Sequence, residues 1–174
     1  MTTSPFNPMG ILSSKSFENS ITSYLPPKPA AIHLWRVFVD RVDPCCKILH
    51  VPTDEVIIYT VIDNPDAASA EAVAKCYAVY FFAVVVMGPA EVTALLEIDK
   101  YTCLTVLKKG IEQAFAHSEL LEAPTVGLLQ AVAIYLVRSK NYGNRLVETC
   151  LTPYQTDTNK WPLVYAVLGC DASP

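Results

Sequence analysis

The chain has 174 residues, a formal net charge of −4, 52% hydrophobic and only 17% charged residues, and a mean hydropathy of +0.30. This length fits one domain with its own core, and the hydrophobic excess indicates a domain that packs against a partner or belongs to something larger. The thirteen basic residues are scattered, so the sequence predicts neither direct binding to duplex DNA nor a basic membrane-surface helix.

The N-terminal part is rich in Ser, Pro and Asn up to the LPPKP stretch, which predicts a flexible arm over residues 1–24 or an extended arm strapped to the domain. A stripe of apolar residues that includes Trp35 then predicts an amphipathic helix over 29–43. Pro44 disfavours helical geometry at the preceding residue, so this helix is expected to stop or kink there.

The next segments alternate between apolar runs and breaks. Residues 54–62 fit either a strand, by their β-branched content, or the start of a helix. After Asn64-Pro65, an Ala-rich segment predicts one long helix over 66–87. Its uncharged stretch at 76–90 is interrupted by Gly88-Pro89 and is shorter than the roughly twenty apolar residues of a membrane span, which favours a buried helix.

Further helices are expected over 90–97, 99–119 and 124–140, and the pattern dissolves into an irregular tail at 144–174. We find no repeat with a period of 20–50 residues. The predicted fold is therefore all-α: a bundle-like domain of four to five helices over residues 25–143, between an irregular arm and an irregular tail.

The stretch DPCCKILHVPT invites a chemical interpretation, because it places Cys45, Cys46 and His50 close together. A zinc site would need four ligands, and adjacent cysteines rarely serve one structural zinc well. A Cys-His nucleophile would need an orienting third group and an oxyanion hole, and no such motif is present. The favoured interpretation is a corner: buried cysteines that act as small hydrophobes, and a turn in which His50 bonds a helix end while Pro52-Thr53 start the next element.

For the other polar residues, too, a structural role is weighed against a functional one. His33 is expected at the surface, and His117 near the end of its helix, where a cation suits the terminal carbonyls. Glu91, Glu97 and Asp99 surround a helix junction and could form an acid–base pair, although solvated helix ends are commoner. The six cysteines show no CxxC spacing and the N-terminus shows no export signal, so we expect reduced, intracellular thiols.

Three blocks in this order resemble the middle homology region of fungal zinc-cluster transcription factors. They are LPPKPAAIHLWRVFVDRVDPCCKILHVPT (25–53), KCYAVYFFAV (75–84) and LKKGIEQAFAHSELLEAPTVGLLQAVAIYLVRSKN (107–141). The motif residues carried over are structural: Trp35, Pro44, Leu49, His50, Pro52 and Thr53. The resemblance implies an all-helical regulatory domain and assigns no catalytic, cofactor-binding or metal-binding residue to this chain.

Two departures qualify the resemblance. Such factors carry an N-terminal Zn2Cys6 cluster that docks in DNA, whereas residues 1–28 contain no cysteine, so zinc is expected only in that cluster of full-length relatives. From Asn144 onward the sequence does not match the family. We interpret the chain as truncated: a fragment, a shortened paralogue, or a gene whose final stretch is misread.

The leading hypothesis is a nuclear, non-catalytic transcription regulator that lacks its own DNA-binding cluster. Its expected partners are a second copy or a zinc-cluster transcription factor, with a small-molecule effector as a further option and no membrane contact. Without the family resemblance, the cytoplasm would be the expected location. The alternative is a small helical enzyme or ligand-binding protein of fungal secondary metabolism derived from this domain.

Overall fold

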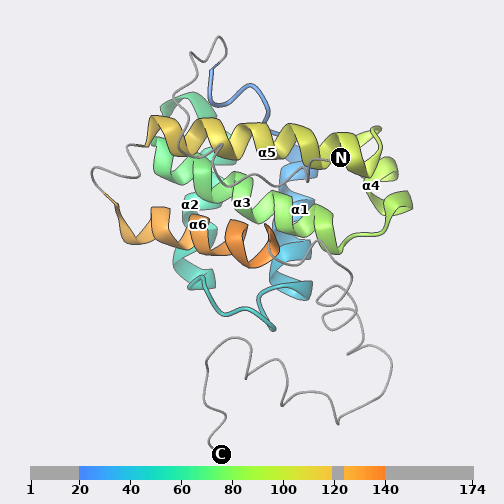
Figure 1. The fold of residues 1–174 in the computed structure, drawn as a ribbon, viewed down its shortest axis with the longest axis horizontal. Helices are drawn as coiled ribbons and strands as arrows, with labels where there is room; N and C mark the ends of the chain where they lie inside the picture. The colour runs from blue at the N-terminus through green and yellow to red at the C-terminus, as the bar shows by residue number, and fades with distance from the viewer. Residues whose placement is uncertain (1–19, 119–123, 140–174) are drawn as a thin grey trace, which may run out of the picture.

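A computed structural model describes residues 20–118 and 124–139 of the chain (Figure 1). Within these ranges the regular structure is entirely helical and contains no strand, which confirms the all-α class. The part of the chain that the structure describes has six α-helices, with a short 3-10 turn between the second and third. Their bounds are α1 Lys28–Arg41, α2 Val51–Asp63, η2 Pro65–Ala67, α3 Ala70–Val86, α4 Pro89–Leu96, α5 Lys100–His117 and α6 Val126–Ser139.

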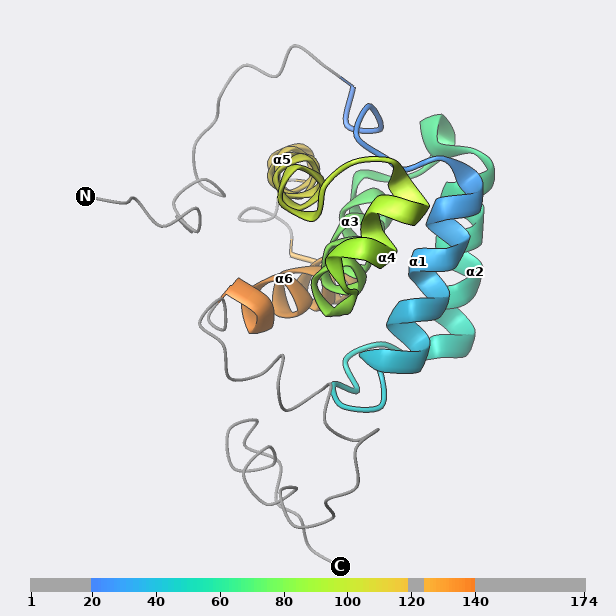
Figure 2. The same ribbon diagram turned by 90° about the vertical axis from the view of Figure 1, so that its right-hand side faces the viewer.

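Helix α3 is the centre of the domain. Its residues 73–86 are all buried, as expected for a helix that is apolar on every side. Figure 2 shows α3 between the α1–α2 pair on one side and α5 and α6 on the other, with α4 at one end. Of the helices in the described part of the chain, none has both the length and the apolar character needed to cross a bilayer.

Helix α2 resolves the open alternative at 54–62. Its β-branched residues form a helix because Ile58, Val61 and Ile62 recur at helical spacing and are buried together. Pro52 occupies the first turn, where a missing N–H has no cost. Tertiary packing of this apolar face therefore outweighs the β propensity of the segment, and α2 raises the helix number above the four to five expected.

The expected single helix over 66–87 is wrong at its beginning. Pro65–Ala67 form the separate 3-10 turn, and Ala68 adopts an extended conformation. Ser69 is the N-cap of α3, and its hydroxyl accepts a hydrogen bond from the Ala72 N–H at 3.2 Å. A serine that satisfies an unpaired N–H of the first turn sets the start of a helix more strongly than alanine content does.

Two lysines bind the carbonyl groups at the C-terminal ends of helices. Lys100, at the start of α5, donates to the carbonyl oxygens of Val85 and Met87 at 2.7 and 2.6 Å, where α3 ends. Lys28, at the start of α1, donates to the Asp63 carbonyl at the end of α2 at 3.2 Å. Each ammonium meets carbonyls that lack helical partners, at the negative end of a helix dipole.

The phenol of Tyr77 ties the N-terminal segment to the core. Its hydroxyl donates to the Ile21 carbonyl at 2.7 Å and accepts from the Tyr24 N–H at 3.2 Å. Residues 20–24, the last part of the arm expected over 1–24, are thus strapped down. The rest of that arm, at 1–19, and the tail expected at 144–174 lie outside the described residues.

Gly110 permits close contact between α5 and α3. A Cβ at this position would stand 2.5 Å from Cε1 of the Tyr77 ring, well inside van der Waals contact. The ring is fully buried, so it has little room to move. The absence of a side chain at Gly110 is therefore a packing requirement of this helix pair.

We expect Gly110→Ala to lower the free energy of unfolding by about 1–3 kcal/mol, as overpacking does in a dense core, despite the better helix propensity of alanine. Urea unfolding followed by circular dichroism measures the change. Gly88→Ala is the control, because a Cβ there meets its nearest atom, Glu91 Oε2, at an ordinary 3.6 Å. Its loss should be the smaller one, since only the N-cap preference of α4 changes. Equal losses in both variants would contradict the packing explanation.

Candidate functional site

The cysteine pair lies in the connection between α1 and α2. Val42 is the C-cap of α1, and the N–H groups of both Cys45 and Cys46 donate to its carbonyl at 3.0 Å. Pro44 is exposed in this turn. The two cysteines are half-buried, less covered than expected for core residues.

The chemistry of Cys46 does not fit a nucleophile. Burial, together with Cys45 and Asp43, raises the pKa of its thiol to about 11, so the sulfur stays protonated at neutral pH. A nucleophilic cysteine needs the opposite shift, toward thiolate. In residues 20–118 and 124–139, no group of three or more His, Cys, Asp and Glu side chains is arranged to hold a metal ion.

His50 stands at the N-terminus of α2, as its N-cap residue. Its Nδ1 lies 2.9 Å from the Thr53 hydroxyl, and its backbone N–H donates to Asp54 Oδ2 at 2.9 Å. Both side-chain contacts stay within the first turn of α2. The structure places His50, Pro52 and Thr53 on the surface of one helix start, where His50 and Thr53 are hydrogen-bonded.

Two of the other motif residues belong to the core. Trp35 is fully buried and stacks on Phe38, with ring centroids 6.0 Å apart. Leu49, just before α2, is also buried against the same cluster. Phe38 in turn meets Phe82 of α3 edge-on at 6.4 Å, so α1 attaches to the central helix through aromatic contacts.

A buried ion pair, which the sequence did not reveal, connects three helices. Lys75 of α3 donates to Asp54 Oδ1 of α2 at 2.6 Å, with both side chains 5% exposed or less. It also donates to Gln130 Oε1 of α6 at 3.1 Å, and Gln130 Nε2 donates to the Ile48 carbonyl at 2.9 Å. The available signal was a lysine inside an apolar helix, which requires a buried partner.

Two of the three carboxylates at the α4 junction, those of Glu91 and Asp99, bind the N–H groups at helix N-termini. Glu91 accepts two hydrogen bonds from Arg41, at 2.9 and 3.1 Å, and one from the Gly88 N–H at 2.7 Å. Asp99 caps α5 by accepting from the Thr102 N–H at 3.0 Å. Glu97 ends α4 with a φ of 58°. His33 is exposed on α1, and its charge adds slightly to the lowering of the Glu91 pKa.

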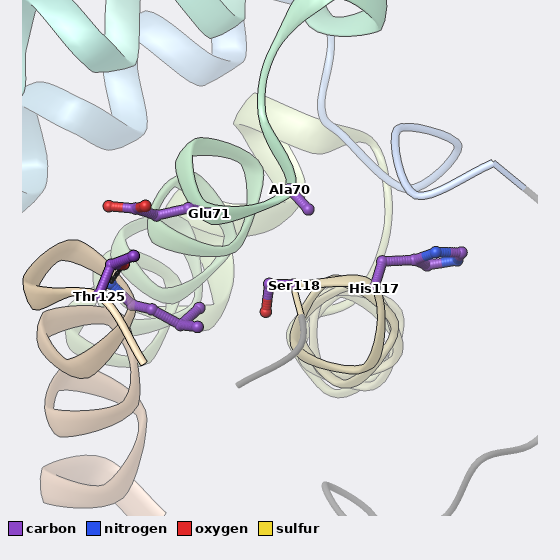
Figure 3. A pocket seen from close by; sticks show the side chains of 6 residues that line it. Ala70, Glu71, His117, Ser118 and Thr125 are labelled. Atoms are coloured by element: carbon purple, nitrogen blue, oxygen red, sulfur yellow. Dashed lines mark hydrogen bonds between the residues drawn. The ribbon is translucent and has the colours of Figure 1, made fainter. Parts of the chain in front are cut away.

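A shallow recess of about 220 Å³ lies where the starts of α3 and α6 meet the end of α5. Figure 3 shows Glu71 reaching toward Thr125, while the His117 ring points away from the recess. Ser118 donates its hydroxyl proton to the Phe115 carbonyl at 2.9 Å. The histidine with the chemistry needed for catalysis therefore does not face the carboxylate.

The outer face of α6, defined here as Val126, Leu129, Val132, Ala133 and Leu136, is apolar throughout. Val126 is 75% exposed, Leu129 53% and Leu136 37%. Val132 and Ala133 are half-buried at the border of this face, and Val132 also packs against the core. The opposite face of the same helix is buried against α3 through residues that include Leu128 and Ile134. A helix that is apolar on both faces is typical of one with a neighbour on each side.

Comparison with known proteins points to fungal transcription factors. The chain is 26% identical over 136 residues to the aurofusarin cluster transcription factor aurR2 of Gibberella zeae, covering 78% of this chain and 20% of that protein. It is 29% identical over 123 residues to the pyriculol/pyriculariol biosynthesis cluster transcription factor 1 of Pyricularia oryzae, covering 70% and 16%. The C6 finger domain transcription factor nscR of Arthroderma gypseum is 27% identical over 139 residues, with coverage of 76% and 19%.

All three relatives are fungal transcription factors, and the chain matches only a part of each. No family model matches the chain, and no solved structure matches it. The chain is distantly homologous to one part of fungal zinc-cluster transcription factors, and it spans 16–20% of the length of the relatives it matches. The matched proteins are named as transcription factors and not as enzymes.

We expect Lys75→Met to lower the free energy of unfolding by about 3–5 kcal/mol, because it leaves Asp54 charged, buried and without its cation. Adding Asp54→Asn should restore part of the loss, since the amide oxygen still accepts from the His50 N–H. Urea unfolding of the two single variants and the double variant gives the coupling energy. Strictly additive losses would contradict the ion pair.

The Arg41 guanidinium, together with the Gly88 N–H, lowers the pKa of Glu91 from 4.5 to about 2. Because the folded-state pKa is the lower one, the stabilisation is fully present above about pH 4.5 and is lost as pH falls toward 2. Unfolding of wild type and Glu91→Gln across this range should show a difference that shrinks with acid. Glu97→Gln is the control and should show no comparable trend.

Proposed function

We propose that this chain is a regulatory, non-catalytic domain of the fungal zinc-cluster transcription factor type, which acts in the nucleus by binding another protein. The observation that carries the proposal is the distant homology to three such factors over most of the chain, within an all-helical domain. In this proposal the contact with DNA belongs to the partner, since the net charge of −4 and the scattered basic residues favour no contact with duplex DNA by this chain.

The outer face of α6 is the proposed contact surface. It offers adjacent apolar side chains without a charged residue among its five members. Contiguous exposed apolar surface marks interaction sites in soluble proteins, and desolvating such a face supplies the driving force for association. The proposed partner is a second copy of the chain or a zinc-cluster transcription factor that offers a similar helix face.

The polar residues of the domain support a non-catalytic role. Asp54 and Lys75 neutralise each other in the core, and Glu91 and Asp99 bind helix ends. The Cys46 thiol stays protonated. Asp54, Glu91 and Asp99 are thus engaged in holding the fold, whereas Val126, Leu129 and Leu136 of the α6 outer face present exposed apolar side chains.

We expect Leu129→Asp to abolish self-association or binding to a purified full-length zinc-cluster transcription factor from the same genome. A buried carboxylate at the centre of an apolar contact costs several kcal/mol, enough to weaken binding at least a hundredfold. Light scattering after size exclusion measures the first outcome, and titration of the labelled partner measures the second.

Tyr101→Asp is the matched control, because Tyr101 is 66% exposed on α5, away from α6. This variant should retain binding. A wild-type chain that stays monomeric and binds no zinc-cluster factor would overturn the proposal, and so would equal losses in both variants.

A further inference from the structure

A groove of about 350 Å³ opens where α2 turns through η2 into α3. Its volume lies at the lower end of the roughly 300–1,000 Å³ of small-molecule sites. Six of its ten lining residues are apolar, among them Val56 and Ile57, and Glu71 and Lys75 supply charged groups. A mainly apolar wall with a smaller number of polar groups is the usual composition of a ligand site.

Lys75 keeps one hydrogen-bond donor available. Its ammonium carries three N–H bonds, and two of them point to Asp54 and Gln130. Within the described part of the chain, no third acceptor is bonded to it. Asp54 is already satisfied on both oxygens, by Lys75 and by the His50 N–H. The hydrogen-bonding group of this network that has no partner among the described residues is therefore the third N–H of Lys75.

Glu71 supplies an acceptor close to this donor. Glu71 Oε1 and Lys75 Nζ lie 2.0 and 3.3 Å from the point where a Cβ of Gly127 would stand, so both reach the same spot beside α6. The cluster contains two carboxylates, of Asp54 and Glu71, and one ammonium. Because its net charge is negative, a ligand that carries a carboxylate or phosphate would be repelled.

We propose that this groove binds a small, uncharged and mostly apolar molecule that carries a hydrogen-bond acceptor next to a donor. The acceptor, such as a ketone oxygen, takes the remaining proton of Lys75. The donor, such as a hydroxyl, gives its proton to Glu71. The apolar body lies against Val56, whose side chain is exposed and lines the groove. The inference uses only the groove and leaves the binding role of α6 untouched.

Three probes of similar size test the ligand class on the full chain. They are 3-hydroxyacetophenone, which is neutral and carries both polar groups, 3-hydroxybenzoate, which is anionic, and ethylbenzene, which is apolar only. Saturation-transfer NMR titration should show saturable binding of the hydroxyketone and at least tenfold weaker binding of the other two. Equal binding of the anion, or no saturable binding of the hydroxyketone, would overturn the proposal.

Two tryptophan variants locate the site. Thr60 lines the groove from α2, and its exposed hydroxyl donates to the Val56 carbonyl at 2.7 Å. Thr105 is its counterpart on α5, exposed and bonded to the Tyr101 carbonyl at 2.9 Å. Thr60→Trp should weaken hydroxyketone binding at least tenfold, while Thr105→Trp leaves it unchanged. Full binding by folded Thr60→Trp would place the ligand elsewhere.

Glu71→Gln tests the electrostatic part separately. The amide keeps an acceptor for the hydroxyl of the probe and removes the negative charge beside Lys75. The preference for the hydroxyketone over 3-hydroxybenzoate should therefore shrink by at least threefold in this variant. An unchanged preference would show that Glu71 does not set the ligand class.

Discussion

Burial of α3 on all sides is the constraint on which the rest of the structure depends. A helix whose residues 73–86 have no solvent-facing side must be enclosed by other elements, and α1, α2, α5 and α6 each give it one apolar face. The enclosure explains where small residues are needed, because Gly110 lets the backbone of α5 approach the Tyr77 ring. It also explains why the polar groups of α3 must find partners within the domain.

The hydrogen-bond partners of the polar groups of α3 come from distant parts of the chain. Lys75 is neutralised by Asp54, which comes 21 residues earlier, and bonded by Gln130, which comes 55 residues later. Such a network fixes the mutual positions of α2, α3 and α6 more specifically than apolar packing alone, since ion pairs and amides demand geometry. The same network leaves a charged group at the edge of a groove, so Lys75 both holds three helices together and is the residue proposed to bond a ligand.

The helices could be predicted from the sequence where periodicity is strong, as in the stripe that contains Trp35 and in the segment that contains Ile111. Segments in which local signals compete were harder to predict. Ile57 and Ile58 have strand propensity, and their helical state depends on contacts of α2 with α1 and α3. The start of α3 at Ser69 was missed because alanine content was weighed above a cap. The Lys75–Asp54 pair could not be foreseen, since spacing along a chain does not tell which helices become neighbours.

The strap between Tyr77 and residues 21–24 sets a mechanical boundary for whatever is attached ahead of it. The Tyr77 phenol is anchored in the core and bonds the backbone of Ile21 and Tyr24. A force applied to the chain ahead of Ile21 would therefore reach α3 through this contact before it reached α1 along the chain. The most buried helix of the domain, and not the first helix along the chain, is thus the one that such a force would load.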